Sequence, residues 1–137
     1  LHFGATQVRP QGRPAGGMAG INLAEGSRVI FFGAVADADE AVVLTAANSS
    51  ASLMGTDPGS AKLSLLSEFP GKGRATGGVR AHKFIRDENQ IYFAYVGEQP
   101  ILAHTSSGKV LELENKLAKR DASGTPISAT IFSAGRA

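Results

Sequence analysis

The stretch that decides the fold reads KGRATGG, residues 72–78, and it places two cations among three glycines without a carboxylate. A related stretch, QGRPAGG, stands at residues 11–17. When the two are aligned, Arg13 falls on Arg74 and the three glycines of each stretch coincide. Recurrence of one pattern along a chain indicates a repeat architecture, so the surrounding segments are expected to recur as well.

The segments that follow the two stretches do match. The first stretch is followed by RVIFFGAV (28–35), AVVLTAA (41–47) and AKLSLLSEF (61–69), and the second by QIYFAYV (90–96), PILAHTS (100–106) and GKVLELENKL (108–117). Short runs rich in β-branched and aromatic residues, separated by turn-forming residues, predict strands. Residues 18–23 and 79–84 are expected to form the first strand of each unit, so that each unit holds four strands. Residues 110–120 have apolar residues that could also line one face of a helix, but their place in the repeat favours a strand.

A third, weaker copy reads KRDASGTPISATIF, residues 119–132, with Arg120 in the place of Arg74. The opening segment LHFGATQV resembles the closing segment LSLLSEFP, residues 63–70. Four-stranded units repeated in tandem predict an all-β, propeller-like fold with about two and a half blades in this chain. The expected boundaries are 1–8 for the last strand of a preceding blade, 9–69 and 70–118 for two blades, and 119–137 for the start of another. We expect the chain to be part of a longer polypeptide, and either to associate with copies of itself or to complete a larger propeller.

Composition narrows the function classes. The chain has 137 residues, 42% of them hydrophobic and 19% charged, which is typical of one globular domain and contains no apolar run long enough for a membrane span. There are no cysteines, which excludes disulfides and thiolate chemistry and favours a reducing, cytoplasmic compartment. Neither a GxSxG nor a phosphate-binding GxxxxGK[ST] motif occurs, and the histidines His2, His82 and His104 lack metal-ligand spacing. We therefore expect no cofactor, no metal and no catalytic site.

Positive charge gathers around the motif although the net charge is only +2. Four cations stand in the segment from Phe69 to Lys83 inclusive, with His82 beside them and no acidic residue among them. Glycine-rich turns expose backbone N–H groups and arginine offers a fork that fits phosphate, so a regular row of such loops predicts a surface for the backbone of duplex DNA, without base specificity. The predicted contacts are Arg9, Arg13, Lys72, Arg74, Arg80, Lys83, Lys119 and Arg120.

A structural interpretation of the same motif stands beside this one. The glycine pairs fall where one unit passes to the next, and a crossover needs positive φ or close backbone approach. Arg13 and Arg74 would then bind neighbouring carbonyl groups instead of phosphate. The competing function from another class is a propeller that binds proteins and not DNA; an enzyme with its site at the propeller centre would need convergent polar groups, which the sequence does not show.

RPQGRPAGGMAGINL (9–23) and FPGKGRATGGVRAHKF (69–84), each followed by the same succession of strands, resemble the C-terminal domain of the A subunit of bacterial type IIA topoisomerases. The resemblance covers essentially the whole chain. It implies a β-pinwheel that binds, bends and wraps duplex DNA on its basic outer edge, near the nucleoid. The implied partners are DNA, the B subunit, and the rest of the A subunit.

The same resemblance implies a non-catalytic role, because the strand-passing tyrosine and the ATPase of the ATP-dependent enzyme belong to other regions. Tyr92 and Tyr95 stand in an apolar run and are interpreted as packing residues. Gyrases carry a QRRGGKG box that supports wrapping with a defined hand, and this chain has no such stretch. Both gyrase and topoisomerase IV therefore remain open as the parent enzyme.

Overall fold

The computed structural model describes residues 1–53 and 55–137, and its regular structure consists of strands and two short 3-10 turns. The strands are β1 (Ala41–Asn48), β2 (Ser60–Leu65), β3 (Gln90–Glu98), β4 (Ile101–His104), β5 (Val110–Leu111), β6 (Thr125–Pro126) and β7 (Ser133–Arg136). The turns are η1 (Ala5–Gln7) and η2 (Leu66–Glu68). The described residues include no helix that is long and apolar enough to span a membrane. The predicted all-β class is confirmed.

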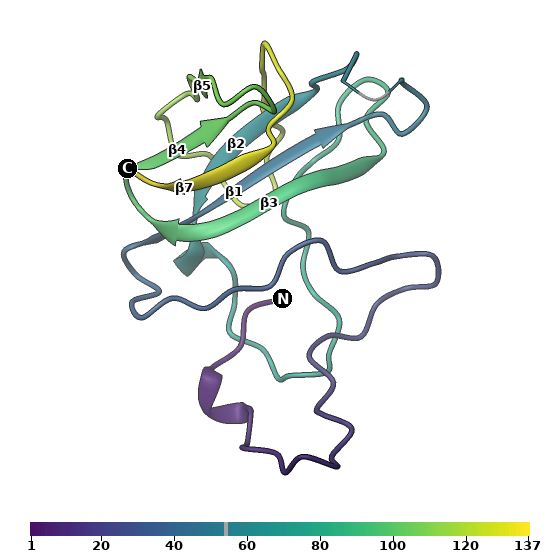
Figure 1. The fold of residues 1–137 in the computed structure, drawn as a ribbon, viewed down its shortest axis with the longest axis vertical. Coiled ribbons are helices and arrows are strands. Elements are labelled where there is room, and N and C mark those ends of the chain that lie inside the picture. The colour runs from purple at the N-terminus through teal and green to yellow at the C-terminus, as the bar shows by residue number, and fades with distance from the viewer. Residues whose placement is uncertain (54) are drawn as a thin grey trace.

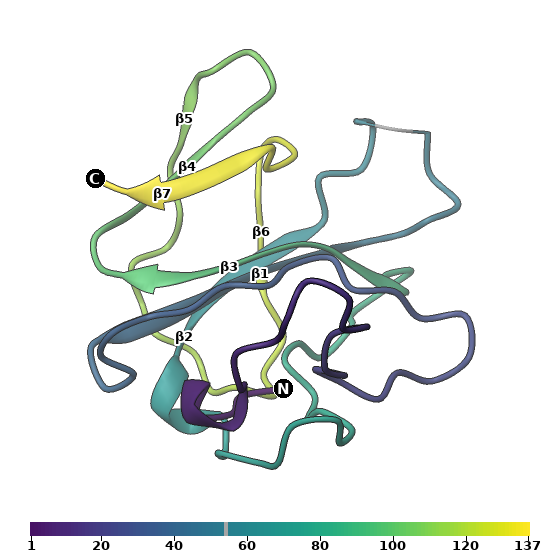
Figure 2. The ribbon, with the colours of Figure 1, turned by 60° about the horizontal axis from the view of Figure 1, so that its bottom comes forward.

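The strands form two sheets that lie one above the other (Figures 1 and 2). One has four strands in the order β3-β1-β2-β6, and the other has three in the order β5-β4-β7. Every neighbouring pair in both sheets is antiparallel. The N-terminal segment and the first part of the segment before β3 lie outside the sheets, at the opposite end of the molecule from β5 (Figure 1).

Strand β1 is the centre of the core because its sequence, AVVLTAAN, is apolar on both faces. On one face Val42, Leu44 and Ala46 pack in the same cluster as Ala103 and Leu111 of the second sheet. On the other face Ala41 and Val43 belong to a second cluster, against which Val35 and Val79 pack. The first sheet is therefore enclosed between the second sheet and the segments that carry residues 35 and 79.

The two sheets repeat one arrangement, and each draws its strands from neighbouring sequence repeats. The order β2-β1-β3 in the first sheet matches β5-β4-β7 in the second. In each case a hairpin of one repeat pairs with a strand of the next repeat, and β6 of the third repeat adds to β2. The boundaries 9–69 and 70–118 stay a prediction of where the sequence repeat divides. Each sheet contains strands from both sides of such a boundary. Sequence similarity identifies the repeat and cannot tell which sheet receives each strand.

The predicted strand 28–35 is wrong. It has no strand pairing, and Val29, Ile30 and Phe32 are 59%, 42% and 79% exposed. The matching run in the second repeat is β3, which pairs with the hairpin of the repeat before it. The described residues contain no hairpin that stands in this relation to 28–35, so a β-prone composition finds no ladder partner there.

Other predicted strands are shorter than the sequence indicated. Residues 18–23 and 79–84 are assigned to no strand, and within 108–117 only Val110–Leu111 is a strand. The segment 61–69 is strand β2 as far as Leu65 and then turns into η2, while 1–8 contains η1 and a single bridge at His2. The helical alternative for 110–120 is not found either.

Candidate nucleic-acid interface

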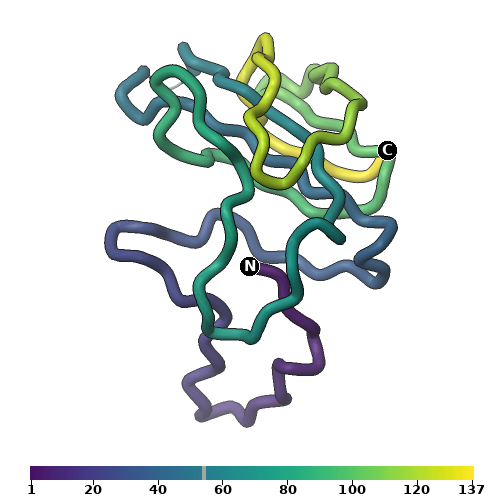
Figure 3. The backbone as a smooth tube through the Cα atoms, turned by 180° about the vertical axis from the view of Figure 1, so that it is seen from behind, coloured from purple at the N-terminus to yellow at the C-terminus, as the bar shows by residue number. Residues whose placement is uncertain are grey.

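The three copies of the glycine-arginine motif form three loops, residues 9–17, 70–78 and 116–124, which we call the first, second and third motif loops. The first and second lie together at the end of the molecule away from β5, as Figures 1 and 3 show from opposite sides. Parallel bridges tie Gly71 to His2 and Leu117 to Leu63, so the second and third loops begin alike.

The motif arginine of one loop reaches the backbone just after the preceding loop. A guanidinium nitrogen of Arg74 donates to the carbonyl of Ala19, and one of Arg120 donates to the carbonyl of Arg80. Ala19 and Arg80 hold the same place, two residues beyond the last glycine of their own loops. The same contact therefore joins the second loop to the first and the third loop to the second.

Backbone bonds repeat in the same register. The amide of Asn22 donates to the carbonyl of Thr76 at 3.0 Å, and the amide of Lys83 donates to the carbonyl of Ala122 at 3.0 Å. The donors lie 61 residues apart and the acceptors 46 residues apart, which are also the spacings of the three motif arginines. Consecutive loops thus stack by one repeated set of contacts.

A side-chain acceptor precedes each stack. The amide of Arg74 donates to Gln7 Oε1 at 2.8 Å, and that of Arg120 donates to Glu68 Oε2 at 2.6 Å. Because Gln7 matches Glu68, the opening segment 1–8 aligns with 62–69, one residue earlier than the sequence comparison suggested. These two acceptors were missed because the opening segment was aligned one residue out of register, although Gln7 and Glu68 stand 61 residues apart, as Arg13 and Arg74 do.

The eight predicted DNA contacts divide by exposure. Five side chains are exposed: Arg9, Arg13, Arg80, Lys83 and Lys119. Lys72, Arg74 and Arg120 are half-buried. Within residues 1–53 and 55–137 the ion pair found is between Arg136 and Glu98, outside this set. No ion pair therefore joins a described cation of the motif loops to a carboxylate, although Asp121 lies within the third loop.

The arginines Arg74 and Arg120 make carbonyl contacts, as the structural interpretation of the motif expected for Arg74. The side chain of Arg13 is exposed and donates no hydrogen bond within the described part of the chain. The repeated contact gives the motif arginine a structural role in the second and third loops. Phosphate contact by any of the three stays a prediction.

The motif glycines serve the crossover in two ways. Gly17 has a φ of +83°, which disfavours a side chain. A Cβ on Gly78 would lie 3.3 Å from the backbone nitrogen of Leu1, and one on Gly124 would lie 2.9 Å from that of Ala61. Gly16 and Gly77 meet nothing within 4 Å, so the requirement concerns the last glycine of each loop.

The sequence did not mark Lys62 as a residue that fixes a motif loop, because it occupies an ordinary strand position. Its side chain is 6% exposed, and its Nζ donates to Ser64 Oγ at 3.0 Å and to the carbonyls of Lys119 and Arg120. Burial lowers the pKa of Lys62 to about 8, opposed by Glu68, so the ammonium form predominates near neutral pH. A buried cation with three acceptors fixes the third motif loop to β2.

His82 was counted with the basic cluster, but the structure buries it, with 3% exposure. Its Nδ1 lies 3.0 Å from Thr45 Oγ1 and its Nε2 lies 3.3 Å from Ser60 Oγ. Ser60 donates to Glu88, so its oxygen accepts from Nε2–H, and Thr45 donates to Nδ1. In a nucleophilic triad the carboxylate binds the histidine instead, and Ser60 is 1% exposed, so this network serves packing.

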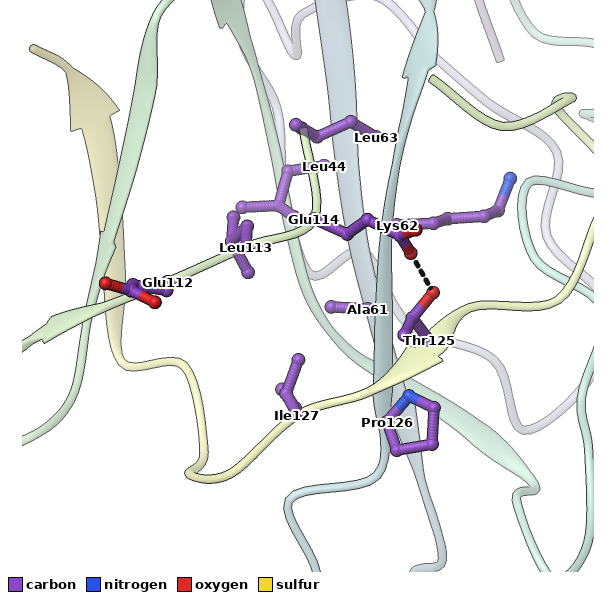
Figure 4. Close-up of a pocket in the computed structure, with 10 residues that line it drawn as sticks. All are labelled: Leu44, Ala61, Lys62, Leu63, Glu112, Leu113, Glu114, Thr125, Pro126 and Ile127. Atoms are coloured by element: carbon purple, nitrogen blue, oxygen red, sulfur yellow. Dashed lines mark hydrogen bonds between the residues drawn. The ribbon is translucent and has the colours of Figure 1, made fainter. Parts of the chain in front are cut away.

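A small cavity between the sheets is lined by Leu44, Ala61, Lys62, Leu63, Glu112, Leu113, Glu114, Thr125, Pro126 and Ile127 (Figure 4). Its volume is about 40 Å³, far below the size of sites for organic ligands. Thr125 donates to Glu114 across it. No group of three potential metal ligands gathers within the described residues.

The match to known proteins covers segments that carry the repeat. The family model of the DNA gyrase C-terminal domain, a β-propeller, matches residues 1–36 and 53–83, which hold the first and second motif copies. The A subunit of DNA gyrase from Aeromonas salmonicida is 39% identical over 80 residues, which is 58% of this chain and 8% of that protein. The chain thus spans a small part of this curated relative.

The crystal structure of the C-terminal domain of DNA topoisomerase IV superposes with a TM-score of 0.71 at 20% identity, covering 97% of this chain and 42% of that one. At this identity the likeness concerns the fold. The fold, the motif copies and the family match agree with the resemblance found in the sequence. The chain therefore resembles the DNA gyrase C-terminal β-propeller domain, by its fold and by a family-model match over just under half of its residues.

Proposed function

We propose that this chain binds duplex DNA through its phosphate backbone, without base specificity, and bends or wraps it along the motif loops. One observation carries the proposal: the three loops stack in a single register, and their described cations form no ion pair with a carboxylate. A row of cations that form no ion pair is the electrostatic footprint of a polyanion site. Bending follows when the row is curved, because DNA then keeps contact with successive loops.

The proposed context is the accessory, non-catalytic C-terminal domain of the A subunit of a type IIA topoisomerase. The family-model match and the similarity to a gyrase A subunit support it. In this role the chain would work in the cytoplasm with the B subunit, together with the remainder of the A subunit. Strand passage and ATP hydrolysis would be carried out by those other parts. Self-association of the isolated chain belongs to the same proposal.

The experiment removes the phosphate contacts from the second repeat together. Replacing Lys72, Arg80 and Lys83 with alanine should weaken binding to duplexes of unrelated sequence by the same factor, because each lost phosphate contact is sequence-independent. Affinity is measured by mobility shift at fixed salt concentration. Unchanged affinity in the triple variant would refute the assignment.

A matched control removes the same charge elsewhere. Arg28, Arg86 and Lys109 are exposed and stand outside both the motif loops and the segment 79–84 that follows the second loop. Their replacement with alanine lowers the net charge equally, so it should change affinity much less than the motif triple variant. Equal effects of the two triple variants would show that net charge, and not the row of loops, governs binding.

A further inference from the structure

The third motif loop is anchored from beneath by a buried cation. The ammonium of Lys62 has three hydrogens and three acceptors: Ser64 Oγ at 3.0 Å, the carbonyl of Lys119 at 2.8 Å, and the carbonyl of Arg120. An ammonium is tolerated at 6% exposure because each hydrogen is used. The backbone at 119–120 is therefore fixed relative to β2.

From this fixed position the third loop holds the segment 80–83 at two points. The guanidinium of Arg120 donates to the carbonyl of Arg80, and the carbonyl of Ala122 accepts from the amide of Lys83 at 3.0 Å. Between these points His82 is buried against Thr45 and Ser60. The backbone of 80–83 is thus constrained, while the side chains of Arg80 and Lys83 are exposed.

We propose that Arg120, anchored by Lys62, is a positioning residue that orients Arg80 and Lys83 for phosphate contact and does not itself contact phosphate. This inference rests on the proposed function. Preorganised cations lose less conformational freedom on binding than flexible ones, so holding their backbone raises affinity without adding a contact. If Arg120 turned to a phosphate, it would give up its hydrogen bond to the Arg80 carbonyl.

The neighbouring contact provides a comparison. Arg74 makes the same bond to Ala19, but the segment 19–22 reads AGIN and carries no cation to orient. The position that matches Lys62 in the first stack is Leu1, which has no ammonium side chain. The positioning effect on DNA contacts therefore belongs to the third loop.

A double-mutant cycle separates positioning from direct contact. Arg120→Ala is measured in the parent chain and in the Arg80→Ala/Lys83→Ala background, by affinity for one duplex at fixed salt. Coupled residues give interaction energies that correspond to about tenfold in affinity. We expect Arg120→Ala to weaken binding about tenfold in the parent and less than about twofold in the background that lacks both cations. An equal loss in both backgrounds would mean that Arg120 contacts phosphate directly.

Amide exchange gives a readout that does not depend on DNA. Arg120→Ala and Lys62→Met should both speed exchange of the Lys83 amide and leave the amides of β1 protected, because only the loop contact is loosened. If the Lys83 amide stays protected in Arg120→Ala, the positioning role is contradicted. Exchange that rises equally in β1 would indicate general unfolding and would contradict the local effect.

The control variant is Arg13→Ala, which removes an exposed cation that is remote in sequence from 80–83. Its effect should be equal in the parent and in the background without Arg80 and Lys83. If the Arg80→Ala/Lys83→Ala variant binds DNA as tightly as the parent, the proposed phosphate contacts themselves fail. If that variant binds weakly but Arg120→Ala is additive with it, the failure concerns the positioning role alone.

Discussion

The last glycine of the third motif copy, Gly124, lies close against strand β2. At Gly124 a Cβ would stand 2.8 Å from Ser60 Oγ and 2.9 Å from the backbone of Ala61. At Gly77 a Cβ would meet nothing within 4 Å. A side chain is therefore expected to clash with backbone at Gly124 and to fit without a clash at Gly77, although both are motif glycines.

Replacing Gly124 with alanine should lower the free energy of unfolding by about 1–3 kcal/mol, as overpacking does when backbone must move. Gly77→Ala is the matched control and should change it by less than about 0.5 kcal/mol. Chemical denaturation measures both. Equal stability of the two variants would contradict the close approach at Gly124.

Burial lowers the pKa of His82 below its ordinary value of 6.5, with Glu88 opposing and Lys62 assisting. The unfolded chain then binds more protons than the folded chain between the folded pKa and 6.5. Stability is therefore fully present above 6.5 and is lost as the pH falls below it. The free energy of unfolding should drop more between about pH 7 and pH 5 in the parent than in His82→Gln.

The ring titration of His82 tests this shift directly. In the folded chain its midpoint, followed by NMR, should lie below 6.5, because the charged ring would be desolvated and Nδ1 could no longer accept from Thr45. A midpoint at or above 6.5 would contradict the buried, neutral ring.

At the level of elements, β1 and the segment 28–35 are both rich in apolar residues, but only β1 forms a strand. Leu44 in β1 is fully buried between the two sheets, while Phe32 is 79% exposed. Both stand in runs that the sequence predicts as strands. What differs is a pairing partner: β1 has β2 and β3 beside it, and 28–35 has none within the described residues.

Leu44→Ala should therefore cost about 2–5 kcal/mol of unfolding free energy, because it leaves a cavity in the core. Phe32→Ser should cost less than about 0.5 kcal/mol, because little apolar contact is lost. Urea unfolding of both variants measures these two losses of unfolding free energy. A large loss for Phe32→Ser would show that 28–35 is packed and not exposed.

The sequence was sufficient to identify the repeat, but not to predict which of the repeated segments pair as strands. The motif arginines, the glycines and the run 41–47 recur, so the all-β repeat could be predicted. The exchange of strands between repeats could not be predicted, because runs of similar sequence do not indicate which hairpin each one pairs with. Lys62 and the buried position of His82 could not be predicted either: their burial depends on acceptors from distant segments, which no local pattern encodes.

At the scale of the whole molecule, the repeat produces two related sheets and one stack of loops. The sheets supply the core, and the same spacings of 61 and 46 residues bring three cationic loops into consecutive contact. The net charge of +2 is too small to attract DNA by itself. Affinity for DNA would then depend on this local row, and therefore on salt.

Salt dependence of duplex binding tests the central claim most directly, because it counts the phosphates that the loops neutralise. With about four phosphate contacts, affinity should fall roughly a hundredfold between 50 and 200 mM salt, and the slope should shrink in the Lys72/Arg80/Lys83 triple alanine variant. A protein-binding propeller would show little dependence of this kind. Binding that is flat over this range, or a slope identical in parent and variant, would contradict the account.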